Sequence, residues 1–272
     1  MKKLVLFTCI LLLFTSFQKK GITWVAIGDS ITYLNEHPDE TGNRVTRGYM
    51  TLVKEKLPSI NYINKGYNGW TSAGIGDKIE DLNIPTADIY TIFLGTNDWW
   101  QGRPVGTIND YQNNTGTKTL YGSFRVIINK LRILNPKAKI ILITPLQRSD
   151  FVYINNMKNN AWGSYKEKNG QFLAAFAAAI NDIGRAEKLE VIDLYNKSGI
   201  NQKNIVNFKR LRDPKSGEYK NFKYPGFTSV PFNPETDEYP YPHEAINMTY
   251  DGLHPSDKGN KVIARMLIKL MD

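Results

Sequence analysis

Apolar and polar positions alternate along the chain in two regular patterns. Short apolar runs that end in turn residues predict buried strands, and apolar residues spaced three to four apart predict helices with one buried face. The first pattern occurs at residues 24–27, 60–64, 88–94, 138–144 and 190–194. The second occurs at residues 47–57, 73–82, 117–134, 168–188 and 257–271. Regular alternation of strands and helices predicts an α/β fold, with a parallel sheet covered by helices on both faces.

Two segments show neither pattern. Residues 147–164 are polar and predict a loop. Residues 195–250 are rich in proline, asparagine and aromatic side chains, and so long a stretch without regular structure is unusual inside a domain. Only one predicted helix follows this stretch, which disfavours a linker to a second domain. We therefore expect a single domain over residues 21–272, with residues 195–250 as an ordered insertion, packed by its own aromatic side chains over the active face.

The N-terminal residues have the pattern of an export signal. Lys2 and Lys3 precede a mostly apolar run over residues 4–17. This arrangement is typical of a secretory signal peptide, which we place at residues 1–18. The run is too short to span a bilayer, which takes about 20 residues. We therefore expect a secreted, periplasmic or cell-surface protein with no stable membrane span; a retained membrane anchor is the alternative.

Composition narrows the chemistry. Cys9 is the only cysteine, and it lies in the apolar run, so a chain without the signal would have no disulfide, no cysteine nucleophile and no cysteine-ligated metal. Export without disulfides suits a bacterial periplasm or cell surface. The net charge of +9 comes from lysine and arginine scattered without a dense basic block, so we expect no nucleic-acid partner.

A serine directly follows the first predicted strand, in Gly28-Asp29-Ser30. Open α/β sheets bind ligands in the crevice above the carboxyl ends of their strands, so a hydroxyl in this turn would face that crevice. The alternative is that Ser30 only caps the next helix, a common use of serine. The choice between them depends on whether other segments supply a base and an oxyanion site.

His254 is the candidate base. Its side chain has an unperturbed pKa close to neutrality, which suits proton transfer. Pro255 biases His254 away from helical geometry, so the imidazole is expected in a turn just before the last helix. Asp251 lies three residues earlier, from where a carboxylate can curl back to the imidazole Nδ1 and fix its tautomer. The alternative is a surface aspartate and a histidine near a helix cap.

Other mechanisms lack their signatures. The chain has three histidines, His37, His243 and His254, with no H-E-x-x-H motif and no paired cysteines, so we expect no metal and no cofactor. The G-x-S-x-G elbow of α/β-hydrolases is also absent, because Thr32 stands where that motif has its second glycine.

Four segments of the chain, taken together, resemble the motifs of the SGNH hydrolases, the superfamily of GDSL-type esterases and lipases. The similar segments occur in the order of the family's four blocks: Gly28-Asp29-Ser30, residues 64–69, Gly95-Thr96-Asn97-Asp98, and Asp251-Gly252-Leu253-His254-Pro255. The resemblance covers nearly the whole chain after the signal, except residues 195–250. It implies a three-layer α/β/α sandwich with a five-stranded parallel, flavodoxin-like sheet.

The resemblance also implies residue roles. Ser30 would be the nucleophile, His254 its base and Asp251 the residue that orients the base. The oxyanion would be bound by the backbone N–H groups of Ser30 and Gly69 and by the side-chain amide of Asn97. These roles fit the chemistry, because a serine hydroxyl is a weak nucleophile without a base, and fixed donors stabilise a tetrahedral oxyanion.

The substrate is less defined by the sequence. Trp99 and Trp100 follow Asn97 and Asp98, where flat rings could stack on a sugar, and aromatic residues in 219–250 could form another wall. The alternative is that these rings fill the core. We expect a serine esterase that removes short acyl groups, acetyl first among them, from a small ester or an acylated glycan. A lipid-directed acyl hydrolase and a non-catalytic glycan-binding module are the alternatives.

Overall fold

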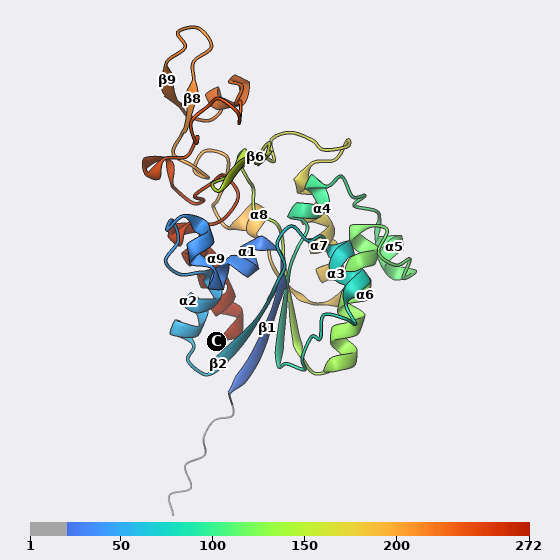
Figure 1. The fold of residues 1–272 in the computed structure, drawn as a ribbon. Coiled ribbons are helices and arrows are strands. Elements are labelled where there is room, and N and C mark those ends of the chain that lie inside the picture. The colour runs from blue at the N-terminus through green and yellow to red at the C-terminus, as the bar shows by residue number, and fades with distance from the viewer. Residues whose placement is uncertain (1–20) are drawn as a thin grey trace, which may run out of the picture.

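The computed structural model describes residues 21–272, and the expected signal peptide lies outside the described residues. Five parallel strands form the central sheet in the order β2-β1-β3-β4-β7 (Figure 1). They are β1 (Ile22–Gly28), β2 (Ile60–Gly66), β3 (Ile89–Phe93), β4 (Lys139–Ile143) and β7 (Glu190–Ile192). The α/β prediction is confirmed, and every predicted strand ends within about two residues of its observed bounds.

Strand β1 lies inside the sheet, with β2 on one side and β3 on the other. Gly28, at the end of β1, pairs with Gly66 of β2 on one side and with Phe93 of β3 on the other. The carboxyl ends of the three strands therefore lie level with one another. In a sheet of this topology, the crevice above that point is the usual place for a ligand.

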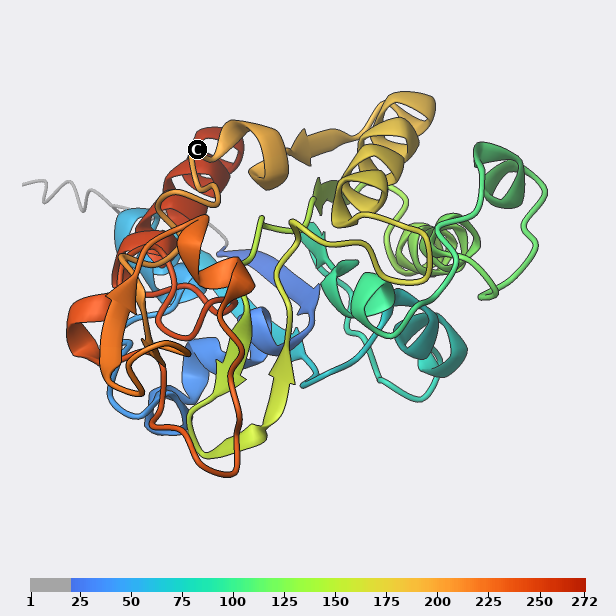
Figure 2. The same cartoon turned by 90° about the horizontal axis from the view of Figure 1, so that it is seen from above.

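Helices cover both faces of the sheet, as the views in Figures 1 and 2 show. Alternate residues of β1 point to opposite faces: Trp24 and Ala26 join one buried cluster, while Val25 and Ile27 join the other. The first cluster includes α2 (Tyr49–Lys56) and α9 (Asp257–Met271), and the second includes α3 (Ser72–Lys78), α6 (Leu120–Leu134) and α7 (Leu173–Glu187). The three-layer sandwich is confirmed.

Several short helices were not predicted. A helix of four or five residues has too few positions to show a periodic pattern. Two of them follow central strands: α1 (Ser30–Tyr33) follows β1, and α4 (Thr96–Trp100) follows β3. The others are α5 (Ile108–Gln112), α8 (Leu194–Lys197) and the 3₁₀ turns Leu34–Glu36, Pro38–Thr41, Gly226–Ser229 and His243–Ala245. No helix within residues 21–272 has the length and apolar character that crossing a membrane requires.

The segment 147–164 is a hairpin, so its prediction as a loop is wrong. Strand β5 (Phe151–Tyr153) pairs antiparallel with β6 (Asn156–Ala161). Most of β6 is exposed and polar, with the sequence NMKNNA, so it carries no apolar alternation from which a strand could be predicted.

The segment 195–250 also holds regular structure, an antiparallel hairpin of β8 (Lys209–Arg212) and β9 (Tyr219–Phe222). Its buried rings, Phe227 and Tyr241, belong to the same apolar cluster as Trp24 of the central sheet. The insertion therefore extends the main core, whereas the sequence predicted packing by its own side chains. It lies at the carboxyl-end side of the sheet, beside the β5–β6 hairpin (Figures 1 and 2).

Candidate active site

Ser30 lies where β1 turns into α1. A Cβ at Gly28 would come within 2.0 Å of Thr32 Oγ1, so a larger residue would crowd this turn. Asp29 caps α1, its Oδ1 accepting the Ile31 N–H at 3.0 Å. Ser30 is the first residue of the helix and lines an open cleft of about 320 Å³ at the carboxyl end of the sheet. The strand and the cap together fix where its hydroxyl lies.

Three side chains from the two ends of the chain form a continuous hydrogen-bonded line. His254 Nε2 lies 2.8 Å from Ser30 Oγ, and His254 Nδ1 lies 2.7 Å from Asp251 Oδ2. The other carboxylate oxygen, Asp251 Oδ1, accepts the backbone N–H groups of Leu253 and His254 at 3.0 and 2.8 Å. Gly252, inside this turn, has a φ of +91°, a conformation that favours glycine. The turn therefore holds the carboxylate against the imidazole.

This geometry selects one imidazole tautomer. A carboxylate only accepts hydrogen bonds, so Nδ1 carries the hydrogen and Nε2 presents its lone pair to the Ser30 hydroxyl. Phe151 contacts the imidazole ring edge to face and Tyr250 stacks on it, with ring centroids 5.4 and 5.9 Å away. An imidazole placed in this way can take the hydroxyl proton, and Asp251 can stabilise the imidazolium that results.

The three residues that the resemblance implied as oxyanion donors, Ser30, Gly69 and Asn97, line the same cleft. Asn97 Nδ2 donates to the Trp70 carbonyl at 3.0 Å, and no other acceptor in residues 21–272 takes the second N–H of this amide. Gly69 has a φ of +74°, and its carbonyl accepts the Gln101 Nε2–H at 2.8 Å. The Ser30 N–H opens α1, where the first N–H groups have no helical partner. The structure thus places these three residues around one cleft.

Asp98 links the segments that carry Asn97 and Gly69. It is buried and accepts hydrogen bonds from the Ser72 backbone N–H at 2.9 Å and from the Ser72 hydroxyl at 2.6 Å. Burial raises the pKa of this carboxyl group, and the bonds from Ser72 oppose that rise. Because α4 carries Asp98 and α3 begins at Ser72, the bonds tie the helix of Asn97 to the loop that contains Gly69.

Arg148 is a cleft residue that the sequence did not indicate. It is 1% exposed, and its Nη2 donates to the Trp162 carbonyl at 3.2 Å. Its guanidinium lies 5.4 Å from the rings of Trp99 and Trp100. Burial lowers the pKa of Arg148 to about 10, against the attraction of nearby carboxylates that include Asp251. It gave no sequence signal because the segment around it has no periodic pattern.

The two tryptophans have different surroundings. Trp99 is fully buried and its Nε1 donates to the Gln171 carbonyl at 2.9 Å, so it has no face for a ligand. The prediction that Trp99 binds substrate is therefore wrong: it belongs to the core. Trp100 is half-buried and lines the cleft. Of the aromatic residues in 219–250, Tyr250 lines the cleft, and the β5–β6 hairpin supplies Phe151 and Tyr153.

Comparison with solved structures finds a similar protein of high identity. The crystal structure of a possible lipase from Chitinophaga pinensis DSM 2588 is 61% identical, covers 92% of this chain and 97% of that chain, and has a TM-score of 0.91. An acetyl xylan esterase, at 20% identity, covers 92% of this chain and 100% of its own, with a TM-score of 0.55. A lipase/acylhydrolase from Enterococcus faecalis, at 18% identity, covers 92% and 95%, with a TM-score of 0.51. The last two show a shared fold alone.

A search of curated protein sequences found no match. Among protein families, the GDSL-like Lipase/Acylhydrolase family matches residues 26–262, which include both Ser30 and His254. The chain therefore belongs to the GDSL-like lipase/acylhydrolase family, within the SGNH hydrolases.

Proposed function

We propose that this protein is an exported serine esterase that removes short acyl groups, acetyl first among them, from a carbohydrate. Family membership makes it a carboxylic ester hydrolase; the catalytic residues, the acyl group, the alcohol and the location are our proposals. The observation that carries the catalytic proposal is the line of hydrogen bonds from Ser30 through His254 to Asp251, at 2.8 and 2.7 Å, in an open cleft.

The mechanism follows from these contacts. Ser30 Oγ attacks the ester carbonyl while His254 Nε2 takes the hydroxyl proton. The carbonyl oxygen becomes an oxyanion, which the N–H groups of Ser30, Gly69 and Asn97 stabilise. Collapse of this intermediate breaks the C–O bond, and His254 gives its proton to the departing alcohol. Water, activated by His254, then hydrolyses the acyl-enzyme and restores Ser30.

The surroundings of Ser30 favour a short acyl group and a polar alcohol. The cleft encloses about 320 Å³, at the small end for binding sites. Its wall carries the polar side chains of Glu40, Asn68, Gln101, Arg148 and Asn159 as well as apolar ones that include Leu34, Phe151 and Leu253. A long acyl chain would place many methylene groups against these polar side chains, which gains little from burial. Trp100 adds one aromatic surface on which a sugar ring could stack.

The exported location rests on the N-terminal pattern. Lys2 and Lys3, followed by the apolar run at residues 4–17, support a cleaved signal. Expression of the full chain in a bacterium with a cell envelope tests it. We expect the mature protein, shortened at its N-terminus, in the periplasm or medium; a full-length protein in the cytoplasmic fraction would contradict the proposal.

A substrate screen tests the function. Acetate release is measured from a panel of acetylated polysaccharides that includes acetylated xylan, given the fold shared with an acetyl xylan esterase. p-Nitrophenyl esters of increasing chain length are measured in parallel, with Ser30→Ala as the control. We expect acetate release from at least one glycan and the highest kcat/KM on acetate. A preference for chains of about eight carbons or more would instead favour a lipid substrate.

A further inference from the structure

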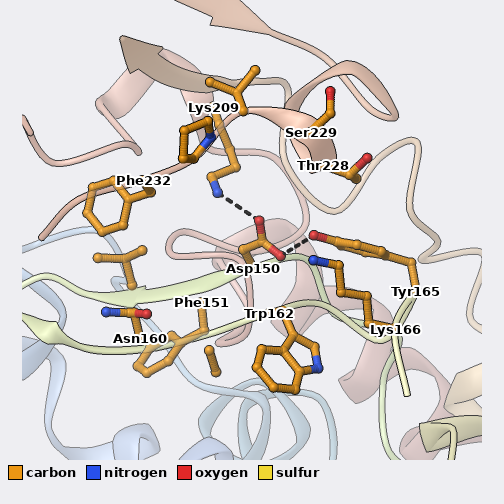
Figure 3. Close-up of a pocket in the computed structure, with 14 residues that line it drawn as sticks. Asp150, Phe151, Asn160, Trp162, Tyr165, Lys166, Lys209, Thr228, Ser229 and Phe232 are labelled. Carbon is orange, nitrogen blue, oxygen red and sulfur yellow. Dashed lines mark hydrogen bonds and ion pairs between the residues drawn. The ribbon is translucent and has the colours of Figure 1, made fainter. Parts of the chain in front are cut away.

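A second pocket lies beside the catalytic cleft, between the β5–β6 hairpin and the 195–250 insertion (Figure 3). It has a volume of about 330 Å³, close to that of the cleft. None of the proposed catalytic residues lines it. Its wall combines aliphatic and aromatic side chains with polar and charged ones, among them Asp150, Trp162, Tyr165, Lys209, Ser229 and Phe232.

The hairpin forms the wall between the two hollows. Successive side chains of a strand point to opposite faces. One set of hairpin residues lines the cleft: Phe151, Tyr153, Asn159 and Ala161. The alternate set lines the second pocket: Val152, Asn160 and Trp162. Phe151 and Ala161, which are paired across the hairpin, line both, so the cleft and the pocket adjoin at this end.

A buried ion pair lies in the second pocket. Lys209 is 2% exposed, and its Nζ lies 2.8 Å from Asp150 Oδ2. The other oxygen, Oδ1, accepts the Tyr165 hydroxyl at 2.6 Å and the Gly163 N–H at 2.8 Å. Figure 3 shows Lys209 and Tyr165 pointing toward the same carboxylate. Burial alone would raise the pKa of Asp150, but the Lys209 charge and these donors hold it below its usual value, so the carboxylate stays ionised.

This pair has unused hydrogen-bonding capacity. An ammonium group has three N–H donors, and Lys209 makes a single hydrogen bond within residues 21–272. Asp150 Oδ2 likewise accepts one bond there and has room for another. A donor and an acceptor therefore lie side by side. Neighbouring hydroxyl groups of a sugar, each able to donate and to accept, match such a pair.

The remaining walls fit the other side of a sugar ring. Trp162, Tyr165 and Phe232 offer rigid aromatic surface next to the ion pair. Trp162 also contacts Trp100 of the cleft, edge to face, with ring centroids 4.7 Å apart. A purely apolar ligand such as an acyl chain would leave the unused N–H donors of Lys209 and the second lone pair of Asp150 Oδ2 without partners, which disfavours it.

We propose that this second pocket is a sugar-binding subsite, which holds one ring of the acylated glycan while the ester on another ring lies at Ser30. The inference rests on the proposed function, since it assigns the same glycan to both hollows. It adds that the substrate is an oligosaccharide or polysaccharide, recognised at a sugar that does not react.

Two matched variants of the full chain test the subsite. Ser229→Tyr adds a ring at the wall of the pocket, and Ser216→Tyr adds the same ring in the turn between β8 and β9, outside both hollows. Both serines are exposed, so both variants are expected to fold, which circular dichroism and thermal melting check. Phe232→Ala is a further variant, which opens the pocket wall without filling it.

The measured quantity is the kcat/KM for acetylated xylotetraose or cellotetraose divided by the kcat/KM for p-nitrophenyl acetate. We expect Ser229→Tyr to lower this ratio about ten-fold or more, through KM, a loss equivalent to one good contact. Phe232→Ala lowers the ratio by a smaller factor, and Ser216→Tyr keeps the wild-type ratio. Equal ratios in Ser229→Tyr and Ser216→Tyr would overturn the subsite while leaving the esterase proposal intact.

Titration in a Ser30→Ala background separates binding from catalysis. Isothermal titration with acetylated xylotetraose measures affinity without turnover, and we expect Ser229→Tyr to weaken it about ten-fold relative to Ser216→Tyr. This comparison of affinities decides for or against the subsite whether or not the protein is active. Failure of the wild-type protein to hydrolyse p-nitrophenyl acetate would overturn the proposed function separately. Hydrolysis of that simple ester with neither turnover nor binding of either tetrasaccharide would overturn the subsite and the choice of a glycan together.

Discussion

The catalytic cleft and the second pocket lie on the two faces of one hairpin, yet different parts of the chain build them. The cleft takes Ser30 and Asn97 from turns that directly follow central strands, so the sheet places them. The second pocket takes its side chains from residues 150–166 and 209–232, outside the sheet. Reacting groups thus depend on the shared fold, whereas the proposed sugar contacts depend on insertions that other members of a fold can vary freely.

The two regions also differ in how they bury carboxylates. Asp29, beside Ser30, is buried, and this raises its pKa to about 6 although the Ile31 N–H stabilises the charge. Asp150 is buried beside Lys209, which with its other donors keeps its pKa below the usual value. The ionised carboxylate of Asp29 therefore costs stability at neutral pH, while that of Asp150 contributes stability.

Removal of the proposed nucleophile, Ser30, gives the largest expected effect, and it changes the cleft and not the second pocket. Ser30→Ala should lower kcat on p-nitrophenyl acetate by about 10⁴-fold or more, because no other group can form the acyl-enzyme. The melting temperature should stay close to that of the wild type. Ser216→Ala, a serine in an exposed turn, is the control. Residual activity within about a hundredfold of wild type would contradict the assignment of Ser30.

The tryptophan pair compares the core with the cleft at neighbouring positions. Trp99→Ala should lower the free energy of unfolding by about 3 to 5 kcal/mol, since a fully buried ring leaves a cavity. Trp100→Ala should cost less stability and should mainly raise KM for acetylated glycans. Denaturant unfolding and steady-state kinetics measure the two effects. Equal losses of stability would show that Trp100 is a core residue as well.

Substitution of Asn97 tests the proposed oxyanion site. Asn97→Ala should lower kcat about 100- to 1000-fold with little change in KM, because the donor acts on charge that develops in the transition state. Asn97→Asp keeps the shape but replaces the donor with an acceptor, so we expect at least the same loss. Rates on p-nitrophenyl acetate measure both. A loss carried by KM alone would mean that Asn97 binds the ground state.

The smallest expected effect is a pH dependence of opposite sign at the two carboxylates. The pKa of Asp29 in the folded protein, about 6, exceeds its ordinary value of 3.8. The wild-type protein therefore loses stability at Asp29 as the pH rises between these two values. Asp29→Asn should therefore gain roughly 1 to 3 kcal/mol of stability relative to wild type from about pH 4 to pH 8. Asp150→Asn should lose stability relative to wild type as pH rises from below the lowered folded pKa of Asp150 to its ordinary 3.8, and this loss should stay nearly constant up to pH 8. Unfolding curves at several pH values check this, and parallel trends would contradict it.

The sequence was sufficient for the sheet and for the turns around it. Buried parallel strands are apolar runs, and each of the five runs proved to be a central strand. Ser30 and Asn97 follow such strands directly, so their common edge could be predicted before any contact was known. The turn of His254 follows no strand, and only the resemblance to known hydrolases placed it near Ser30.

The remaining features depend on tertiary contacts that leave no periodic signal. Strand β6 is polar and exposed, and Arg148 is buried in a segment without apolar alternation. Trp99 and Trp100 are neighbours on the five-residue helix α4. The orientation of this helix about its axis places the Trp99 ring in the core and the Trp100 ring at the cleft. Such an orientation is set by packing, which is why the sequence treated both rings alike.

The reactivity of Ser30 tests the central claim most directly. The wild-type protein and its His254→Ala and Ser30→Ala variants are treated with a fluorophosphonate, and the modified peptide is identified by mass spectrometry. We expect one adduct, on Ser30, that forms much more slowly without His254 and is absent from Ser30→Ala. An unlabelled wild-type protein, or an adduct on another residue, would contradict the account.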